Sequence, residues 1–324
     1  MTVTALAATE TAAQRHFAPR RLGHVNLVVS DVDRSMEFYK SVVGIEEAYV
    51  QPKVRAGFLS NGNTHHDIGM VEASGPLGLG RKPGLNHIAL ELETEVDLVR
   101  GYERALAEGV VFARSADHDI AHSVYGKDPD GNQYELYADV IHDWRNARSG
   151  VVTKPKPNWT PGSTPPNARR NYHADPALTR LEKAIFHPLR TTHAALVLEQ
   201  FEAGVDYYTN VTGLSLVAGG RDAAFAVLGG TCGERNLSLF RAGRSQALGL
   251  HHVGFQARDD ADLDASISRL RAQGAAPYLE IDHAVRRAVY ILDPDGIRLQ
   301  FHLDRARPAA EWNALDPVVA LLLA

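Results

Sequence analysis

The sequence predicts an α+β fold in which four βαβββ modules pair into two domains, each built on a curled sheet. Three observations support this prediction. Segments of the N-terminal half recur in the C-terminal half, strand and helix periodicities alternate in a fixed order, and a proline-rich stretch separates the halves. One module alone leaves a sheet face uncovered, so two modules are expected to close around that face.

Three segments recur between the halves. HVNLVVSDVDRSMEFYKSVVGIEE, which starts at His24, recurs as HAALVLEQFEAGVDYYTNVTGLSL, which starts at His193. LNHIALELE recurs as LHHVGFQAR, and VYGKDPDGNQYELYAD recurs as VYILDPDGIRLQFHLD. Repetition of this kind indicates a duplicated structural unit.

Each half also contains two copies of one order of elements: a strand, a helix and three further strands. Residues 22–30 alternate as a strand does, and apolar residues at helical spacing follow, between Asp31 as N-cap and Gly44 as the C-terminal stop. Short strand-like runs complete the first module, at 45–50, 54–60 and 67–73. The same order restarts at Asn86, with a strand at 86–93, a helix at 94–108 before Gly109, and strands near 110–114, 122–128 and 132–138.

The patterns divide the chain into five parts. We expect a flexible N-terminal tail at 1–20, a two-module domain at 21–140, a linker at 141–188, a second two-module domain at 189–304 and a helical tail at 305–324. The linker contains KPKPNWTPGSTPPNARR, whose prolines exclude a helix or a central strand and indicate an ordered or semi-rigid connection. Modules can pair within each half, or crosswise, the first with the fourth and the second with the third. The sequence leaves both pairings open.

The composition argues against several classes of protein. With 44% hydrophobic and 23% charged residues and a net charge of -5, the chain has the composition of an ordinary globular protein and gives no reason to expect a nucleic-acid partner. Its one cysteine, Cys232, excludes an internal disulfide framework and a cysteine-based zinc cluster, and fits a cytoplasmic location. No apolar run approaches the roughly 18 residues of a membrane span, so no membrane partner is expected.

Two histidines and a glutamate lie at related places in the first two modules. His24 is on the first strand of module one, His87 is at the equivalent place in module two, and Glu135 is on the last strand of module two. Two imidazoles and a carboxylate bind one face of an octahedral metal and leave positions open, as in non-haem Fe(II) oxygenases. A lone strand histidine is more often a buried polar side chain than a ligand, but the repeat places this pair at equivalent positions.

The motifs around these residues resemble a known family. HDIAHSVYGKDPDGNQYE, from His118 to Glu135, is similar to the signature of type I extradiol dioxygenases: a histidine, a hydrophobic-Tyr pair, Asp-Pro-x-Gly and a ligand Glu. FLSNGNTHHDIGM, at 58–70, resembles the family segment that places an acid–base histidine before an aspartate. LNHIALELE resembles the strand that bears the second iron-binding histidine. The chain thus resembles the vicinal oxygen chelate superfamily, and within it the dioxygenases that cleave catechols.

This resemblance implies a reaction and a set of roles. It implies that His24, His87 and Glu135 bind Fe(II), which uses O₂ to cleave a catechol-type substrate in aromatic catabolism. His66 is then the acid–base group, Tyr125 bonds to the substrate oxygen, and His118 donates to a nearby developing anion. A homo-oligomer is expected by fold analogy. Further residues are expected around the site, namely His65, Asp67 and His122 as supporting groups and Phe58, Ile68 and Met70 as pocket walls.

The C-terminal half departs from this pattern. It keeps His193 and His252, but Gln300 stands where the first half has Glu135, and Arg235 stands opposite His66. A neutral amide is a poorer ligand for a hard divalent ion than a carboxylate, so this half is expected to hold a degenerate site. Under crosswise pairing, His193 would instead join the ligands of the first half.

Two other functions stay open. One is a glyoxalase-like isomerase or lyase, with a redox-inert metal and a protein carboxylate as base. Such sites tend to take a fourth ligand from the last strand of module one, where this chain has His66 rather than a glutamate. The other is a protein that binds an aromatic compound or antibiotic, although such relatives are usually single two-module chains without the His/Tyr signature.

Overall fold

The computed structural model describes residues 15–233, 235–244, 246–305 and 309–324. Of the expected N-terminal tail, residues 1–14 lie outside this description. The placed part packs on the body, because Phe17 is only 3% exposed and its ring lies 6.2 Å from that of Phe112. The packed body therefore begins before residue 21.

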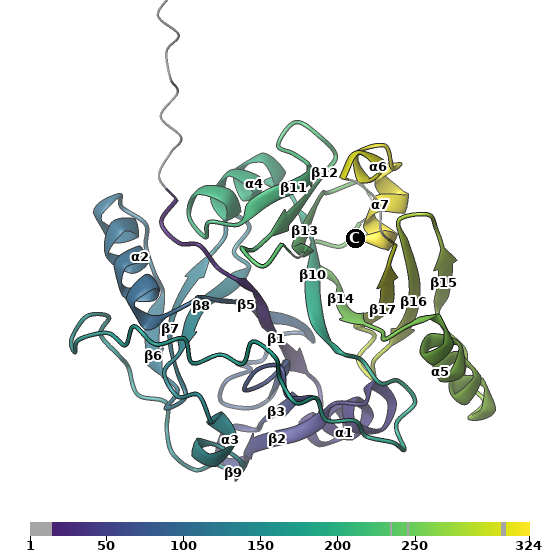
Figure 1. The fold of residues 1–324 in the computed structure, drawn as a ribbon, viewed down its shortest axis with the longest axis horizontal. Coiled ribbons are helices and arrows are strands. Elements are labelled where there is room, and N and C mark those ends of the chain that lie inside the picture. The colour runs from purple at the N-terminus through teal and green to yellow at the C-terminus, as the bar shows by residue number, and fades with distance from the viewer. Residues whose placement is uncertain (1–14, 234, 245, 306–308) are drawn as a thin grey trace, which may run out of the picture.

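Two mixed sheets form the molecule, one in each half, and confirm the predicted fold class (Figure 1). The first sheet contains β1 (Arg21–Val29), β2 (Glu46–Gln51), β3 (Ala56–Ser60), β4 (Ile68–Glu72), β5 (Gly84–Glu91), β6 (Arg114–Asp117), β7 (Ala121–Lys127), β8 (Gln133–Asp139) and β9 (Gly150–Val151). The second contains β10 (Arg190–Leu198), β11 (Ser215–Gly219), β12 (Phe225–Gly229), β13 (Arg235–Arg241), β14 (Gly249–Gln256), β15 (Leu279–Asp282), β16 (Arg286–Leu292) and β17 (Arg298–Asp304).

Helices follow the first strand of every module, as the repeat predicts. They are α1 (Val32–Phe38), which continues as a π-helical turn over Tyr39–Val43, α2 (Glu95–Ala107), α4 (Phe201–Asn210) and α5 (Asp260–Ala272). Asp31 caps α1 by accepting from the Arg34 backbone, and Gly44 ends the π-helical turn at φ +89°, as expected. Three short helices complete the set: α3 (Trp144–Ala147), α6 (Ala309–Asn313) and α7 (Pro317–Leu323). Among the described residues, no helix has the length and hydropathy to cross a membrane.

The strand order decides how the modules pair. The first sheet runs β6-β7-β8-β5-β1-β4-β3-β2-β9 and the second runs β11-β12-β13-β10-β14-β17-β16-β15. The first strands of modules one and two, β1 and β5, pair in antiparallel fashion, and so do β10 and β14. The modules therefore pair within each half, and the crosswise alternative is wrong.

Each sheet presents a different set of side chains to each face. On β1, Val25, Leu27 and Val29 join the core beneath the helices, whereas His24 and Val28 alternate with them and face the opposite side. Successive strand residues point to opposite faces, so each curled sheet has an inner face that forms a cup. We call the cup of the first sheet the N-terminal cup and that of the second the C-terminal cup.

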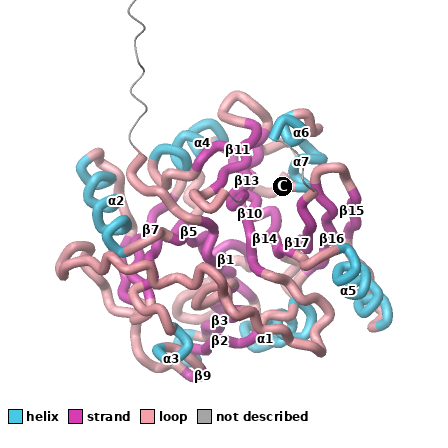
Figure 2. Tube along the Cα trace, viewed as in Figure 1, coloured by secondary structure: helices cyan, strands magenta, loops and turns pink. Residues whose placement is uncertain are grey.

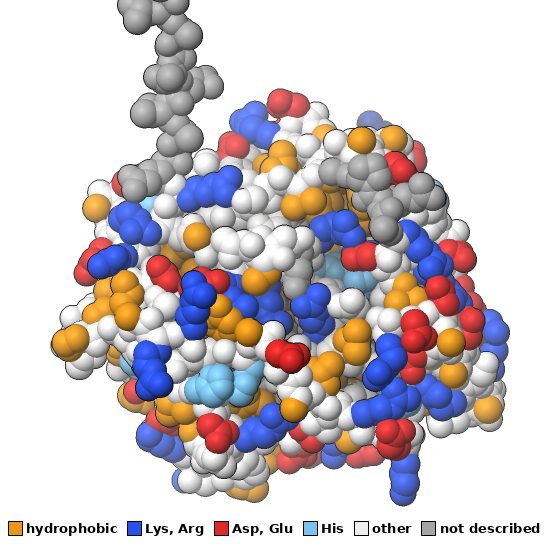
Figure 3. All heavy atoms as spheres, viewed as in Figure 1, with side chains coloured by type: hydrophobic (Ala, Val, Ile, Leu, Met, Phe, Trp, Pro, Cys, Tyr) orange, Lys and Arg blue, Asp and Glu red, His pale blue; other side chains and the backbone are white. Residues whose placement is uncertain are grey.

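The segment between the halves is ordered and lies against the first sheet. It contains α3 and β9, which pairs in parallel with β2, and Figure 2 shows most of the rest as loop. Residues 154–159 connect strands near the two edges of the sheet: the Lys154 carbonyl accepts from Gln51 on β2 (3.4 Å), and the Pro157 carbonyl accepts from the Asp117 amide on β6 (3.0 Å). We call residues 154–159 the strap. On the face shown in Figure 3, positive and negative side chains are interspersed.

The two Asp-Pro-Asp-Gly turns join the halves reciprocally. Asp130 accepts from the backbone amides of Glu199 (2.6 Å) and Gln200 (2.9 Å), just before α4. Asp295 accepts from the Ser30 amide (2.8 Å), just before α1, and pairs with Arg34 (2.8 Å). Each turn therefore supplies acceptors near the start of a helix in the other half, where backbone amides lack partners.

Candidate metal centre

Three adjacent strands bring the predicted ligands together in the N-terminal cup. His24 is on β1, His87 on β5 and Glu135 on β8. Ala89 lies opposite His24 in one ladder and beside Glu135 in the next, so these two side chains emerge from one row of the sheet. A register shift in β1 separates the His24 pairing from that of Leu22. Bulges of this kind re-aim side chains next to functional sites.

The three side chains converge on one point. The Glu135 Oε2 atom lies 3.1 Å from His24 Nε2 and 3.0 Å from His87 Nε2. One donor atom from each residue lies within 4.8 Å of the other two, and all three residues are buried. This is the set and the approximate spacing that a single metal ion needs.

Electrostatics keep these groups in the form that binds a metal. Burial lowers the pKa of His24 to about 4 and also lowers the pKa of His87. Burial opposes ionisation of Glu135, but the neighbouring His24 and His87 outweigh it and hold its pKa well below the usual range. At neutral pH the centre therefore presents two neutral imidazoles and one carboxylate, the protonation state that ligation requires.

His65 and His66 form a second group beside His24. Donor atoms of the three histidines also lie within 4.8 Å of one another. The His66 ring centre is 3.9 Å from that of His24, and neither ring nitrogen of His66 has a hydrogen-bond partner among the described residues. His65 Nδ1 is instead 3.2 Å from Asp139 Oδ1. A buried imidazole without hydrogen-bond partners needs an explanation. A ligand bound in the cup, or a substrate hydroxyl that gives up its proton, would supply the missing partner.

His118 and Tyr125 contact one another next to Glu135. The Tyr125 hydroxyl and His118 Nε2 are hydrogen-bonded at 2.9 Å, and His118 Nε2 lies 3.8 Å from Glu135 Oε1. Tyr125 on β7 is directly opposite Glu135 on β8. Burial, followed by the Glu135 charge, raises the pKa of Tyr125 well above its ordinary value, so its hydroxyl stays protonated and can donate.

The donor set fits a divalent metal ion. Besides two imidazoles and a carboxylate aimed at one point, His24 Nδ1 and both nitrogens of His66 are buried without hydrogen-bond partners among the described residues. A two-histidine, one-carboxylate set is the one used by non-haem Fe(II) enzymes, and it leaves positions for other ligands.

Some expected neighbours lie elsewhere. Phe58 does line the cup, with its ring 5.0 Å from His66, but Ile68 and Met70 pack in the core beneath the helices. His122 points out of the cup, where it bonds to Glu95 on α2 (2.6 Å). Asp67 does not orient His66, because its carboxylate accepts from the Ser60 hydroxyl (3.0 Å) and the Asn61 amide (3.1 Å).

Sequence reasoning missed three residues near the cup. Tyr49 on β2 stacks on Phe58 with ring centres 4.2 Å apart. Arg148 follows α3, and its guanidinium lies 5.4 Å from the Tyr49 ring centre. Lys156, on the strap, has its ammonium 4.5 Å from the Phe58 ring centre. The two cations come from the proline-rich connection, whose composition signals neither strand nor site.

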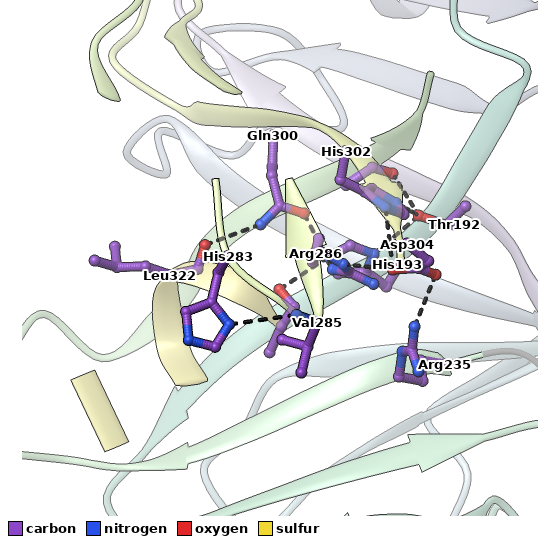
Figure 4. A network of polar contacts seen from close by, with 12 residues as sticks. Thr192, His193, Arg235, His283, Val285, Arg286, Gln300, His302, Asp304 and Leu322 are labelled. Atoms are coloured by element: carbon purple, nitrogen blue, oxygen red, sulfur yellow. Dashed lines mark hydrogen bonds and ion pairs between the residues drawn. The ribbon is translucent and has the colours of Figure 1, made fainter. Parts of the chain in front are cut away.

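The C-terminal cup holds protein atoms at the matching place. The backbone oxygen of Ala324, which follows α7, accepts from His252 Nε2 (2.6 Å) and His193 Nε2 (3.0 Å). Figure 4 shows Arg286 beside His193 and Gln300, two of the three groups that match the candidate ligands. The Arg286 Nη1 atom lies 3.4 Å from His193 Nε2 and 3.2 Å from Gln300 Oε1, and its Nε donates to Asp304 (2.7 Å).

Arg286 has no counterpart in the first half. Arg286 is the first residue of β16 and lies four residues before Tyr290. The first residue of β7, four residues before Tyr125, is Ala121. The C-terminal cup therefore contains a guanidinium, and its two histidines are hydrogen-bonded to the residue that follows α7. This arrangement extends the expectation that the half is degenerate, which rested on Gln300 and on Arg235 opposite His66.

Comparisons with known proteins agree with this architecture. A model of the Glyoxalase/Bleomycin resistance protein/Dioxygenase superfamily matches residues 21–136 and 190–301. The chain is 31% identical over 125 residues to biphenyl-2,3-diol 1,2-dioxygenase 3 of Rhodococcus globerulus, covering 37% of this chain and 63% of that protein, less than two thirds of its length. It is 24% identical over 264 residues to catechol-2,3-dioxygenase of Bacillus subtilis (strain 168), covering 78% and 88% of the two chains.

Solved structures with the same fold include both dioxygenases and a glyoxalase. The 2,3-dioxygenase LapB of Pseudomonas sp. KL28 aligns with a TM-score of 0.66 at 17% identity, covering 93% of this chain and 97% of that chain. The Mn(II)-bound glyoxalase of Novosphingobium aromaticivorans aligns at 0.64 and 17% identity, covering 88% and 82%. Identities this low establish the fold alone. Because the family model matches both halves, the resemblance seen in the motifs is confirmed, and the chain belongs to the Glyoxalase/Bleomycin resistance protein/Dioxygenase superfamily.

Proposed function

We propose that the chain is an Fe(II)-dependent extradiol dioxygenase that cleaves a catechol-type diol with O₂ in its N-terminal cup. One observation carries this proposal: His24, His87 and Glu135 converge, with His66 next to His24 and the His118–Tyr125 pair next to Glu135. Relatives named as biphenyl-2,3-diol and catechol-2,3-dioxygenases support the reaction class.

Each group in the cup has a role in this reaction. Bound Fe(II) would supply electron transfer between a chelated aromatic diol and O₂. His66 is buried and neutral, since burial and then His24 lower its pKa well below the usual value, so it can accept a proton from a diol hydroxyl. Tyr125 can donate its hydroxyl proton in a hydrogen bond to a substrate oxygen. Tyr49 and Phe58 offer stacked rings against which an aromatic substrate can pack.

The main rival activity is a metal-dependent isomerase or lyase, and one relative in structure is a Mn(II)-bound glyoxalase. That chemistry uses a protein carboxylate as base and fourth ligand. In this cup His66 and His65 stand next to His24, and the carboxylate of Asp67 is taken up by Ser60 and Asn61. The imidazole in place of a carboxylate favours the dioxygenase.

The test is loading with Fe(II) under argon, followed by O₂ uptake with catechol and detection of a ring-opened product. Glu135→Gln is the matched control, because it gives the first half the residue that the second half has as Gln300. We expect the variant to fold, to lose metal and to consume no O₂. Failure of the iron-loaded wild type to consume O₂ with any of a panel of diols would reject the proposal.

A further inference from the structure

Two cations from the connection between the halves face the N-terminal cup. Arg148 is 2% exposed, and Lys156 on the strap is half-buried. Arg148 lies near Tyr49 and Lys156 lies over Phe58, and these two rings stack on each other. The Phe58 ring is in turn 5.0 Å from His66, whose ring is 3.9 Å from that of His24. A continuous series of contacts therefore joins the cations to the candidate metal centre.

The positive charge here is only partly neutralised. Asp119 pairs with Arg148 (3.3 Å) and also with Lys154, which lies on the outer side of the strap and is 66% exposed. Arg148 Nη1 is buried without a hydrogen-bond partner among the described residues. The described residues also place no carboxylate within ion-pair distance of Lys156, which has only the Phe58 ring beneath it. Asp119 is thus shared between Arg148 and Lys154, and no carboxylate among the described residues pairs with Lys156.

Two cations with so little compensating negative charge lower the stability of the folded chain unless an anion binds between them. A buried donor without a partner, or a cation held away from water, destabilises the folded chain. Burial, with Arg148 as the second cause, lowers the pKa of Lys156 to about 7, and an anion beside it would favour its charged form. The strap holds Lys156 at this place by hydrogen bonds at both of its ends, to β2 and to β6.

We propose that Lys156 and Arg148 bind a carboxylate on the ring substituent of the diol, so that the preferred substrates are carboxylated catechols. Neither cation is a candidate ligand: Lys156 lies against the Phe58 ring and Arg148 lies near the Tyr49 ring. A carboxylate forms charge-assisted hydrogen bonds with both an ammonium and a guanidinium. Tyr49 and Phe58 would then contact the apolar part of the same molecule. This inference rests on the proposed function and specifies its substrate class.

The experiment compares two diols that differ only in the charged group: dihydroxyphenylpropionate and propylcatechol, each as the 2,3- and the 3,4-diol. Binding to the iron-loaded protein is measured by calorimetry under argon. We expect the wild type to bind one of the carboxylates at least about tenfold more tightly than its uncharged partner, as charge-assisted bonds imply. Lys156→Met should lose that preference and keep its affinity for propylcatechol.

Lys154→Met is the matched control, since it removes the same charge from the same segment but from a side chain that pairs with Asp119 outside the cup. It should keep the preference. Arg148→Gln should reduce it, and if that variant does not fold, the two lysine variants still decide. Equal wild-type affinity for both diols, or a preference that survives Lys156→Met, would overturn the inference and leave the dioxygenase proposal standing. Binding of neither diol would reject both.

Discussion

Single replacements distinguish the two cups. Glu135 in the first corresponds to Gln300 in the second, and Ala121 corresponds to Arg286. The first change removes a negative charge from the candidate ligands, and the second introduces a guanidinium among them. Both changes act in the same direction, because a cation bound by protein donors needs negative charge and room. At this scale, function depends on very few side chains.

His66 gives the first prediction at the residue scale. Replacing His66 with Asn keeps a polar side chain of similar size but removes the group that can take a proton. We expect iron content and anaerobic diol binding near those of the wild type, with kcat lower by about 10²–10⁴-fold, the usual contribution of a positioned acid–base group. Single-turnover kinetics with catechol measure this step. An unchanged kcat would show that His66 takes no part in the reaction.

Asp67 gives a prediction on pH. Burial raises its folded-state pKa from 3.8 to about 6, so the folded chain holds this proton more tightly than the unfolded chain does. The associated stability is fully present below about pH 4 and is lost as the pH rises through 6, by roughly 3 kcal/mol in all. Asp67→Asn removes the titration and retains an acceptor. The second half already uses Asn236 here, which accepts from the Gly230 amide (2.9 Å).

Urea unfolding of the metal-free proteins at pH 4 to 8 checks this prediction. The free energy of unfolding of Asp67→Asn, taken relative to the wild type at each pH, should increase as the pH rises from 4 to 8. Other titrating groups cancel in that difference. A difference that stays constant with pH would show that the buried carboxylate titrates normally.

At the scale of elements, the period of the sequence predicts most of what the structure contains. Strand alternation placed His24 on the first strand, and the residue types at the ends of the helical spacing gave the caps at Asp31 and Gly44. The alternation failed at Ile68 and Met70 because β4 begins only at Ile68. The preceding residues, His66 and Asp67, belong to a loop, so the phase of the alternation changes between His66 and Ile68.

The strap could not be predicted in the same way. Its prolines correctly excluded a helix, but its path across the sheet depends on single hydrogen bonds to Gln51 and Asp117, which leave no periodic trace in the sequence. The candidate ligands, by contrast, lie at repeated strand positions and could be found from the sequence. Their convergence could not, because module pairing depends on long-range contacts between the first strands of neighbouring modules.

The reciprocal turns give a prediction at this scale. Asp130→Ala removes an acceptor from two backbone amides before α4, and Asp295→Ala removes one from Ser30 and Arg34 before α1. Each substitution should lower the free energy of unfolding by about 1–2 kcal/mol, and the two effects should add because the sites share no partners. Asp222→Ala is the control, since that side chain is 96% exposed. Urea unfolding is measured for the wild type, the two single variants, the double variant and the control, and the turns do not join the halves if the double variant unfolds like the control.

At the scale of the whole molecule, duplication has produced two cups with different contents. The N-terminal cup has candidate ligands and a strap that bears Lys156. The C-terminal cup has its matching histidines bonded to the Ala324 backbone oxygen after α7. The C-terminal tail, which was expected to be helical, packs into the second half, where Leu321 and Leu323 are buried.

This asymmetry leads to the last prediction, which compares equivalent histidines. His24→Ala should remove a candidate ligand and abolish both iron retention and O₂ uptake. His193→Ala should retain about one iron per chain and near-normal turnover, because β10 pairs with β14 and never reaches the N-terminal cup. It should still lose about 1–3 kcal/mol of stability, since it removes the buried hydrogen bonds that His193 makes with Thr192 and Ala324. Metal analysis, O₂ uptake and thermal unfolding separate these effects. If His193→Ala lost iron while His24→Ala stayed active, the working centre would lie in the C-terminal half, which contradicts the proposal.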